Sequence, residues 1–239
     1  MTSPQFEFLE WDTQFFGFRI ARITADILST EELSSVLHWC RAERIRCLYW
    51  LVAIGERSAI QMAEEHRFAL VDIRVTLEMK PKPTQRRSTR VRLAREDDLP
   101  TLLRIAGSAH TDSRFYSDPN FPRERCDELY RVWVEKSVKG YAERVLVAEE
   151  ENGPAGYITC HRNDYNGSIG LMAVADWARG RGLGDELVAS SVDFFAASGA
   201  SFVSVVTQAR NISAQRLYQR SGFLTRSVQL WYHRWFSQP

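Results

Sequence analysis

The 239-residue chain has 31 basic and 30 acidic side chains, a formal net charge of +1, and 44% hydrophobic residues. This balance, without a long basic or acidic run, argues against a nucleic-acid or membrane partner, and no apolar run reaches the length of a membrane span. The first residues show neither the basic nor the apolar segment of a secretory signal. The 4 cysteines and 5 histidines lack metal-ligand spacing, which predicts free thiols, no metal site and a cytoplasmic protein.

The first eighty residues predict a small α/β lobe with the order β-β-α-β-α-β. A turn over Trp11–Gly17 separates the first two strands, and Ser29 or Thr30 is expected to cap the first helix. The later strand 68–79 alternates apolar and polar residues, with Asp72 on its polar side. The expected strands are 6–11, 18–23, 48–54 and 68–79, and the second helix is 58–66.

Residues 81–89 are polar, basic and twice interrupted by proline, which is typical of a linker. They divide the chain into an N-terminal lobe, 1–80, and a second domain, 90–239. That domain predicts the order β-α-α-β-β-β-α-β-α-β. Its expected strands are 91–93, 145–149, 155–161, 169–174, 202–207 and 227–235, and its helices are 99–108, 123–139, 183–195 and 211–220.

A strand, a glycine-rich loop and a helix follow one another between Ser168 and Ser191. Backbone N–H groups and the helix dipole converge at such a junction, so the loop Arg179–Gly184 predicts an anion site, most simply for phosphate. The loop lacks the Gly-Lys-Ser/Thr ending of a P-loop, and Asp185 breaks the dinucleotide spacing. A surface turn of an unrelated α/β fold is the alternative interpretation.

Two motifs, in order, carry a resemblance to a known family. Arg179, Gly182 and Gly184 match the pattern Arg/Gln-x-x-Gly-x-Gly/Ala, which resembles the pyrophosphate loop of the GNAT (Gcn5-related) N-acetyltransferases. The segment from Asn211 to Phe223 resembles the family's Asn-x-x-Ala-x-x-x-Tyr-x-x-x-Gly-Phe helix. The resemblance implies an α/β fold whose mixed central sheet is splayed at the acetyl-CoA site, with a smaller N-terminal lobe.

Within that family the chain is similar to the bacterial TDP-fucosamine (dTDP-4-amino-4,6-dideoxygalactose) acetyltransferase group. The similarity rests on the segments Trp11–Gly17, Ser113–Phe115, Val134–Gly140 and Val206–Gln208. It implies transfer of an acetyl group from acetyl-CoA to the amine of a nucleotide-linked sugar. An amino acid, an aminoglycoside or a protein N-terminus is the alternative acceptor, and an acyl-CoA sensor or scaffold is the alternative outside catalysis.

The resemblance also implies a set of cofactor contacts. The pantetheine arm lies along the strand as an added strand, and N–H groups near Leu171 and Met172 polarise the thioester carbonyl. The pyrophosphate lies on the loop, and Asn211 bonds the pantetheine amide or caps its helix. The predicted cofactor residues are Leu171, Met172, Ala173, Val174, Arg179, Gly180, Arg181, Gly182, Leu183, Gly184, Asn211, Ala214 and Tyr218.

Tyr218 is the candidate general acid for the departing thiolate, with core packing as the alternative role. Asp72 is the candidate base, acting through water, unless it is an exposed strand carboxylate; Asp112 and His110 are rivals. The candidate acceptor-binding residues are Asp112, Arg114 and Tyr116, and Arg114 meets a phosphate or forms a structural salt bridge. The aromatic segment Gln229–Phe236 predicts an edge strand and a homodimer, or a strand that covers the core.

Overall fold

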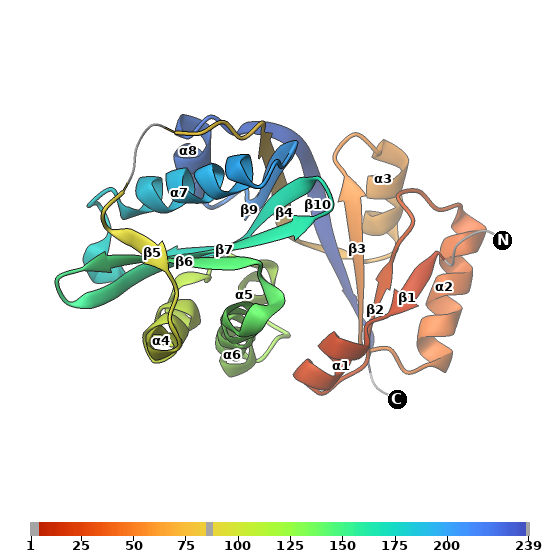
Figure 1. Cartoon of the computed structure of the whole chain (residues 1–239). Coiled ribbons are helices and arrows are strands. Elements are labelled where there is room, and N and C mark those ends of the chain that lie inside the picture. The colour runs from red at the N-terminus through yellow and green to blue at the C-terminus, as the bar shows by residue number, and fades with distance from the viewer. Residues whose placement is uncertain (1–4, 85–87, 238–239) are drawn as a thin grey trace. The chain divides into compact units, whose positions relative to one another are not determined.

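The computed structural model describes residues 5–84 and 88–237 (Figure 1). It contains two compact units. The first holds the described residues up to Arg74, together with Arg114–Phe121 and those from Ser227 onward. The second holds the described residues within Val75–Ser113 and Pro122–Arg226. The strands β4 (Ala69–Met79) and β10 (Leu224–Trp235) each contribute residues to both units.

The first unit is a mixed sheet with helices, and its strands are hydrogen-bonded in the order β1-β2-β3-β10-β4. β2 and β3 run parallel, whereas β1 pairs antiparallel with β2 and β10 antiparallel with β3. The remaining elements are β1 (Phe6–Phe8), β2 (Ile20–Ile23), β3 (Cys47–Ala53), α1 (Glu10–Phe16), α2 (Thr30–Ala42), α3 (Arg57–Glu65) and α5 (Arg114–Ser117).

The start of α2 confirms the predicted cap. The Ser29 side chain accepts a hydrogen bond from the backbone N–H of Glu32, and the Glu32 carboxylate accepts one from the backbone N–H of Ser29. This reciprocal capping box satisfies two N–H groups that a helix start otherwise leaves without partners.

The predicted turn at Trp11–Gly17 is wrong, because this segment forms α1. Trp11 and Phe15 lie one helical turn apart and stack with ring centroids 5.0 Å apart. The helix begins without a side-chain cap at Leu9, so the usual start signal is missing from the sequence. It ends at Gly17, whose φ of 79° is the left-handed conformation that glycine adopts most easily.

One apolar cluster forms the core of the first unit. α2 and α3 supply one side of it, and alternate residues of β1, β2, β3 and β10 supply the other. Its buried members include Ala21, Ile23, Leu33, Val36, Leu37, Cys40, Leu48, Trp50, Val52, Ala59, Ala63, Leu230 and Tyr232. β10 therefore covers the core from a position between β3 and β4, and the expectation that it is an edge strand is wrong.

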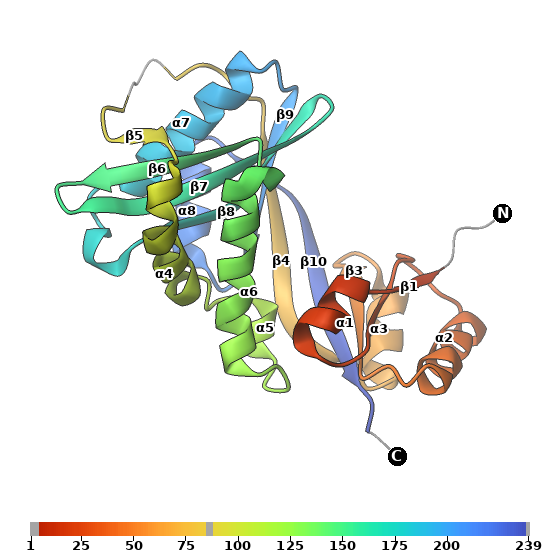
Figure 2. The same cartoon turned by 60° about the horizontal axis from the view of Figure 1, so that its bottom comes forward.

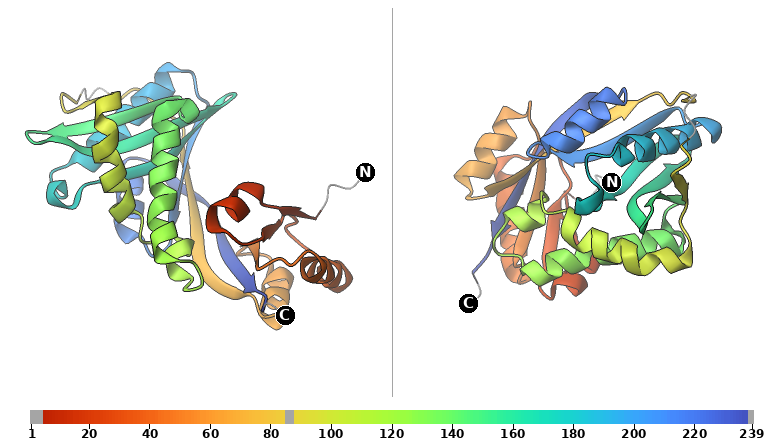
Figure 3. Two further views of the ribbon diagram at one scale, coloured as in Figure 1. Left: turned by 90° about the horizontal axis from the view of Figure 1, so that it is seen from below. Right: turned by 90° about the vertical axis from the view of Figure 1, so that its left-hand side faces the viewer.

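The second unit is a sheet covered on both faces, with the strand order β10-β4-β9-β8-β7-β6-β5. Helices α4 and α6 lie side by side on one face, and α7 lies on the other (Figures 1 and 2, and the right-hand view of Figure 3). The further elements are β5 (Val91–Leu93), α4 (Leu99–Ala109), α6 (Arg123–Lys136), β6 (Arg144–Glu150), β7 (Gly153–Asn163), β8 (Asn166–Val174), α7 (Leu183–Ala197), β9 (Phe202–Gln208) and α8 (Ile212–Arg220).

Two irregularities in β8 matter for the site. β8 runs parallel to β9, but the two strands pair only from Asn166 through Ile169, although both continue further within the described residues. Beyond Ile169 they diverge, as the family resemblance implied. On its other side, β8 pairs with β7 through a register shift between Ile158 and Cys160. This bulge redirects the strand at the point where the splay begins.

The compact units do not follow the predicted boundaries of 1–80 and 90–239. Residues 227–237 and the short segment Arg114–Phe121 group with the first unit, because β10 pairs with β3 and Phe121 packs on first-unit rings. Of the predicted linker, residues 85–87 lie outside the described residues. Thr84 and Ser88, on either side of them, hydrogen-bond to Asp193 and Glu186 of α7.

Candidate active site

The predicted anion loop connects β8 to α7. Gly180 and Gly182 have φ values of 78° and 80°, and a Cβ atom added at either would meet nothing within 4 Å. Glycine is therefore required at both positions by the backbone conformation and not by crowding. Gly182 is the residue before α7, so the first N–H groups of that helix open onto this turn.

Gly184 has a different role from the other two glycines. A Cβ atom here would lie 3.3 Å from a Leu217 methyl carbon and 3.4 Å from the Met172 methyl carbon. Its missing side chain lets the first turn of α7 approach α8 and β8 closely. The loop motif thus joins two positions of positive φ to one position of close packing.

Ion pairs hold the arginines of the loop Arg179–Gly184 and the helix α7 that follows it. Arg179 pairs with Asp176 at 2.9 Å, and Arg181 lies 3.7 Å from a Glu150 carboxylate oxygen. Arg90, which the sequence did not single out, bonds Glu186 of α7, Glu150 and the backbone carbonyl of Arg181. These contacts fix the loop between the hairpin β6–β7 and α7, and the two loop arginines stay more than half exposed toward any anion.

The bulge in β8 is held by side chains that sequence reasoning also missed. The Leu171 N–H donates to the Thr159 hydroxyl oxygen at 2.8 Å, and Thr159 lies 3.1 Å from the Nε2 atom of His161. A Cβ atom at Gly170 would lie 2.6 Å from that Nε2 atom, so a larger residue here would force the His161 and Thr159 side chains to shift. The Leu171 N–H, predicted as a carbonyl donor, therefore has a partner within the protein.

Tyr218, from the second motif, lies on α8 and contacts β8. Its ring is 5% exposed, packs edge-on against Phe223, and directs its hydroxyl to the Met172 sulfur at 3.6 Å. Burial raises the pKa of the hydroxyl above its ordinary value, so the group stays protonated at neutral pH. Asn211 caps α8 by accepting from the Ala214 N–H at 3.0 Å, which is one of its two predicted roles.

The predicted base and acceptor residues are divided between the units. Asp72, 3% exposed, lies on β4 in the first unit, and Arg114 and Tyr116 lie on α5 of the same unit. Asp112 belongs to the second unit.

His110, the other rival base, also belongs to the second unit. Its ring stacks on Tyr130 with centroids 4.6 Å apart and contacts the Tyr157 hydroxyl at 2.8 Å. Burial lowers the pKa of His110 to about 4, so it is neutral at pH 7.

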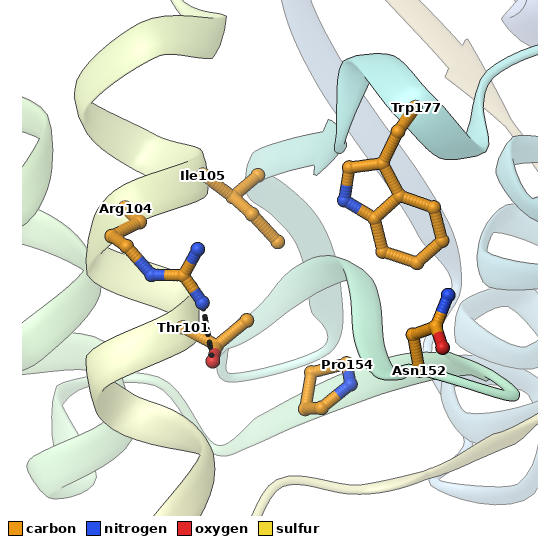
Figure 4. A pocket seen from close by; sticks show the side chains of 6 residues that line it. All are labelled: Thr101, Arg104, Ile105, Asn152, Pro154 and Trp177. Atoms are coloured by element: carbon orange, nitrogen blue, oxygen red, sulfur yellow. Dashed lines mark hydrogen bonds between the residues drawn. The ribbon is translucent and has the colours of Figure 1, made fainter.

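A pocket lies between α4, the β6–β7 turn and the turn with Trp177, which precedes the loop Arg179–Gly184. Figure 4 shows Trp177 and Ile105 facing each other across it, while Arg104 bonds Thr101 at 3.0 Å. It contains none of the predicted site residues. Among the described residues, no helix is long and apolar enough to cross a membrane, and no cluster of His, Cys, Asp and Glu forms a metal site.

Residues 109–223 match the model of the acetyltransferase (GNAT) family, so this part of the chain is a GNAT acetyltransferase domain. The chain is similar to the dTDP-fucosamine acetyltransferase of Escherichia coli O6:H1, with 28% identity over 95% of this chain and 96% of that protein. It is also similar to the spore coat polysaccharide biosynthesis protein SpsD of Bacillus subtilis, with 28% identity over 58% of this chain and 48% of that protein.

Solved structures agree on the fold. A GCN5-related N-acetyltransferase from Sphaerobacter thermophilus superimposes with a TM-score of 0.69 at 15% identity, covering 96% of this chain and 76% of that one. One from Kribbella flavida gives a TM-score of 0.63 at 15% identity, covering 98% and 88%. The predicted GNAT fold is thus confirmed over nearly the whole chain.

Proposed function

We propose that the protein transfers the acetyl group of acetyl-CoA to the primary amine of a nucleotide-linked aminosugar. The observation that carries the proposal is the similarity to the dTDP-fucosamine acetyltransferase, which spans both units and not only the family's common domain. The name of the relative from Bacillus subtilis places that protein in polysaccharide biosynthesis, which is compatible with a sugar acceptor. The four cysteines, all buried and free, suit the cytoplasmic location that the sequence predicted.

The second unit has features that suit acetyl-CoA. The diverging part of β8 offers a strand edge for the pantetheine arm, and the open turn at Gly180 and Gly182 offers N–H groups and positive charge to the pyrophosphate. Acetyl-CoA supplies the thioester. The amine nitrogen forms a bond to the thioester carbonyl carbon, the C–S bond breaks, and the sulfur takes a proton as CoA leaves.

Each predicted residue has a task in this reaction. Tyr218 is protonated and donates its proton to the departing sulfur. Because the Thr159 hydroxyl already engages Leu171, we assign polarisation of the thioester carbonyl to the N–H of Met172. Asp72 is proposed to take the amine proton through water, and Asp112, Arg114 and Tyr116 are proposed to contact the acceptor.

The test is an acceptor panel with radiolabelled acetyl-CoA, containing dTDP-linked aminosugars, amino acids, an aminoglycoside and a peptide with a free N-terminus. Acetylation of the nucleotide sugars with the highest kcat/KM is expected. A higher kcat/KM for any other class would replace this acceptor with that one. Binding of CoA without thiol release on any amine would instead favour a sensor or scaffold.

A further inference from the structure

One face of the first unit's strands carries polar side chains that its core does not use. The strand registers pair Glu7 with Arg22, Arg22 with Tyr49, and Tyr49 with His233. These four residues therefore form a row across β1, β2, β3 and β10, on the face opposite the core cluster. We call this row and the side chains beside it the polar face.

Arg74 extends the polar face onto β4. Ile73 packs against the core cluster, so Arg74, the next residue, points to the opposite face of the strand. β4 is the neighbour of β10, which carries Trp231 and His233 on that face. Sequence alternation and strand order together bring Arg74 beside the row.

Arg114, from α5, lies on an aromatic floor within this unit. Its guanidinium carbon is 4.2 Å from the ring centroid of Tyr49, and 4.3 Å from those of Phe115 and Trp231. Cation–π contacts of this kind hold the planar group in a fixed orientation. The aromatic rings supply no negative charge to neutralise it.

A buried relay fixes Arg114 from its other side. Arg114 donates through Nη1 to the Nε2 atom of His233 at 2.9 Å, and His233 donates through Nδ1 to Asp118 at 2.7 Å. Because Nε2 accepts, the ring is neutral with its proton on Nδ1. Burial, opposed by the Asp118 hydrogen bond, lowers the pKa of His233 to about 4, which agrees with a neutral ring. The relay orients Arg114 through a neutral ring, and the Asp118 carboxylate at its far end makes no ion pair with Arg114.

Arg74 and Arg114 make no ion pair with any described residue, whereas Arg22 pairs with Glu7 at 2.5 Å. The Nε atom of Arg74 is buried without a hydrogen-bond partner, and so is the Tyr49 hydroxyl. Burial and the charges of Arg114 and Arg22 lower the pKa of Arg74, so the three cations act on one another. The carboxylate of Asp12 attracts Arg114 and Arg22 from a distance but forms no ion pair with Arg114 among the described residues, and burial keeps its pKa above the ordinary value.

A half-buried cation without a direct ion pair is costly, and proteins normally compensate it with an anion in contact. Two guanidiniums, one of them held rigidly, offer planar N–H pairs that match phosphate oxygens. We infer that Arg74 and Arg114 form a binding site for the diphosphate of a nucleoside diphosphate. The nucleoside part of this inference rests on the proposed function, whereas the site for an anion follows from the charges alone.

The test is calorimetric titration of the full chain with dTDP, pyrophosphate and thymidine, in the absence of any acetyl donor. dTDP is expected to bind, pyrophosphate to compete with it, and thymidine to bind at least tenfold more weakly than dTDP. Arg74→Gln and Arg114→Lys, which keeps the charge but loses the planar fork, should each weaken dTDP binding about tenfold or more. Arg57→Gln, the same charge change at an exposed position of α3, should leave it unchanged.

Failure of dTDP to bind the wild-type chain, or unchanged dTDP affinity in both variants, would overturn the site. Thymidine binding as tightly as dTDP would do the same, because the diphosphate would then contribute nothing. The proposed function fails separately: dTDP binding that depends on both arginines, without acetylation of any nucleotide sugar, would leave the anion site standing and remove the acceptor. Acetylation of a nucleotide sugar by the wild type, together with dTDP binding that neither variant weakens, would keep the proposed function and remove the anion site.

Thermal unfolding of the ligand-free chain gives a readout that a structural arginine would move in the other direction. Arg74→Gln removes an uncompensated charge, so the melting temperature should stay the same or rise. Saturating dTDP should raise the melting temperature of the wild type more than that of Arg74→Gln. A clearly lower melting temperature of the ligand-free variant would show that Arg74 has a structural counter-ion and would contradict the inference.

Discussion

Replacement of Tyr218 by phenylalanine separates a catalytic hydroxyl from a packing ring. The ring is 5% exposed and rests edge-on against Phe223, with centroids 5.6 Å apart, so phenylalanine fills the same space. The hydroxyl's partner in the described chain is the Met172 sulfur at 3.6 Å, a weak acceptor, so its removal should change stability by about 1 kcal/mol or less. Loss of a general acid instead lowers kcat by roughly 10²–10⁴-fold, or about 3–5 kcal/mol.

The assay is steady-state thiol release with the best acceptor, alongside thermal unfolding and acetyl-CoA affinity. Tyr218→Phe should keep its fold and its cofactor affinity while kcat falls at least about a hundredfold. Tyr232→Phe is the matched control, because that buried hydroxyl contacts Glu64 at 3.4 Å in the first unit and has no predicted part in catalysis. A folded Tyr218→Phe enzyme with the turnover of the wild type would refute the assignment and leave the thiolate to be protonated by water.

The pH dependence adds a second test. Burial raises the pKa of Tyr218 above its ordinary value of 10, so the neutral form is favoured in the folded state. The associated stability is complete below about pH 10 and is lost as the pH rises toward the folded-state pKa, because only the unfolded chain ionises there. Accordingly, the wild-type kcat should not fall between pH 7 and pH 9 through ionisation of this hydroxyl. An alkaline limb in that range would have to come from another group.

Three further predictions follow from the geometry. Gly182→Ala should raise the KM for acetyl-CoA and destabilise the fold by about 1–2 kcal/mol, because alanine is strained at φ 80°. The control is Gly55→Ala, which has open space and no positive φ and should change enzyme kinetics and denaturant unfolding little. Thr159→Val should lower the free energy of unfolding by about 1–3 kcal/mol and lower kcat, because it leaves the Leu171 N–H without a partner. Thr159→Ser keeps the hydroxyl, and equal stability and kcat of the two variants would show that the Thr159 hydroxyl does not hold β8. His233 should account for a loss on the order of 3 kcal/mol in the stability of the wild type as the pH falls from about 6.5 to 4, because burial lowers its pKa to about 4 and the unfolded state binds the proton first; His110, with its pKa also lowered to about 4 by burial, adds a separate loss over the same range. A further loss below about pH 4 comes from Asp118, whose pKa hydrogen bonds lower to about 2 against burial. Chemical denaturation of His233→Gln should show a flatter acid limb, and a limb as steep as that of the wild type would contradict the assignment.

The elements that the sequence predicted correctly are those whose signals are local. The loop Arg179–Gly184 could be recognised because positive φ at Gly180 and Gly182 is a property of each residue's own backbone. The capping box at Ser29 likewise needs only residues within one turn. α1 was missed because its start has no capping side chain, so the local signal on which the prediction depends does not exist there.

The candidate site was only partly predictable for the same reason. The sequence gives the residues of the two family motifs, but not that Tyr218 and Gly184 both meet Met172, since those residues come from three separate elements. Thr159 and Arg90 carry no sequence signal, because their roles depend on which backbone or carboxylate the fold places opposite them.

The sequence by itself therefore determined the class of protein and the backbone conformation of the loop Arg179–Gly184, through requirements that act over a few residues. The tertiary structure alone decided that β10 lies inside the first unit's sheet and that Arg114 rests on Tyr49 and Trp231 without an ion pair among the described residues. Both depend on pairings between segments more than a hundred residues apart, such as Tyr49 with His233. Whether a charge is compensated is a property of such pairings, because the Coulomb energy depends on distance in space and not on separation along the chain.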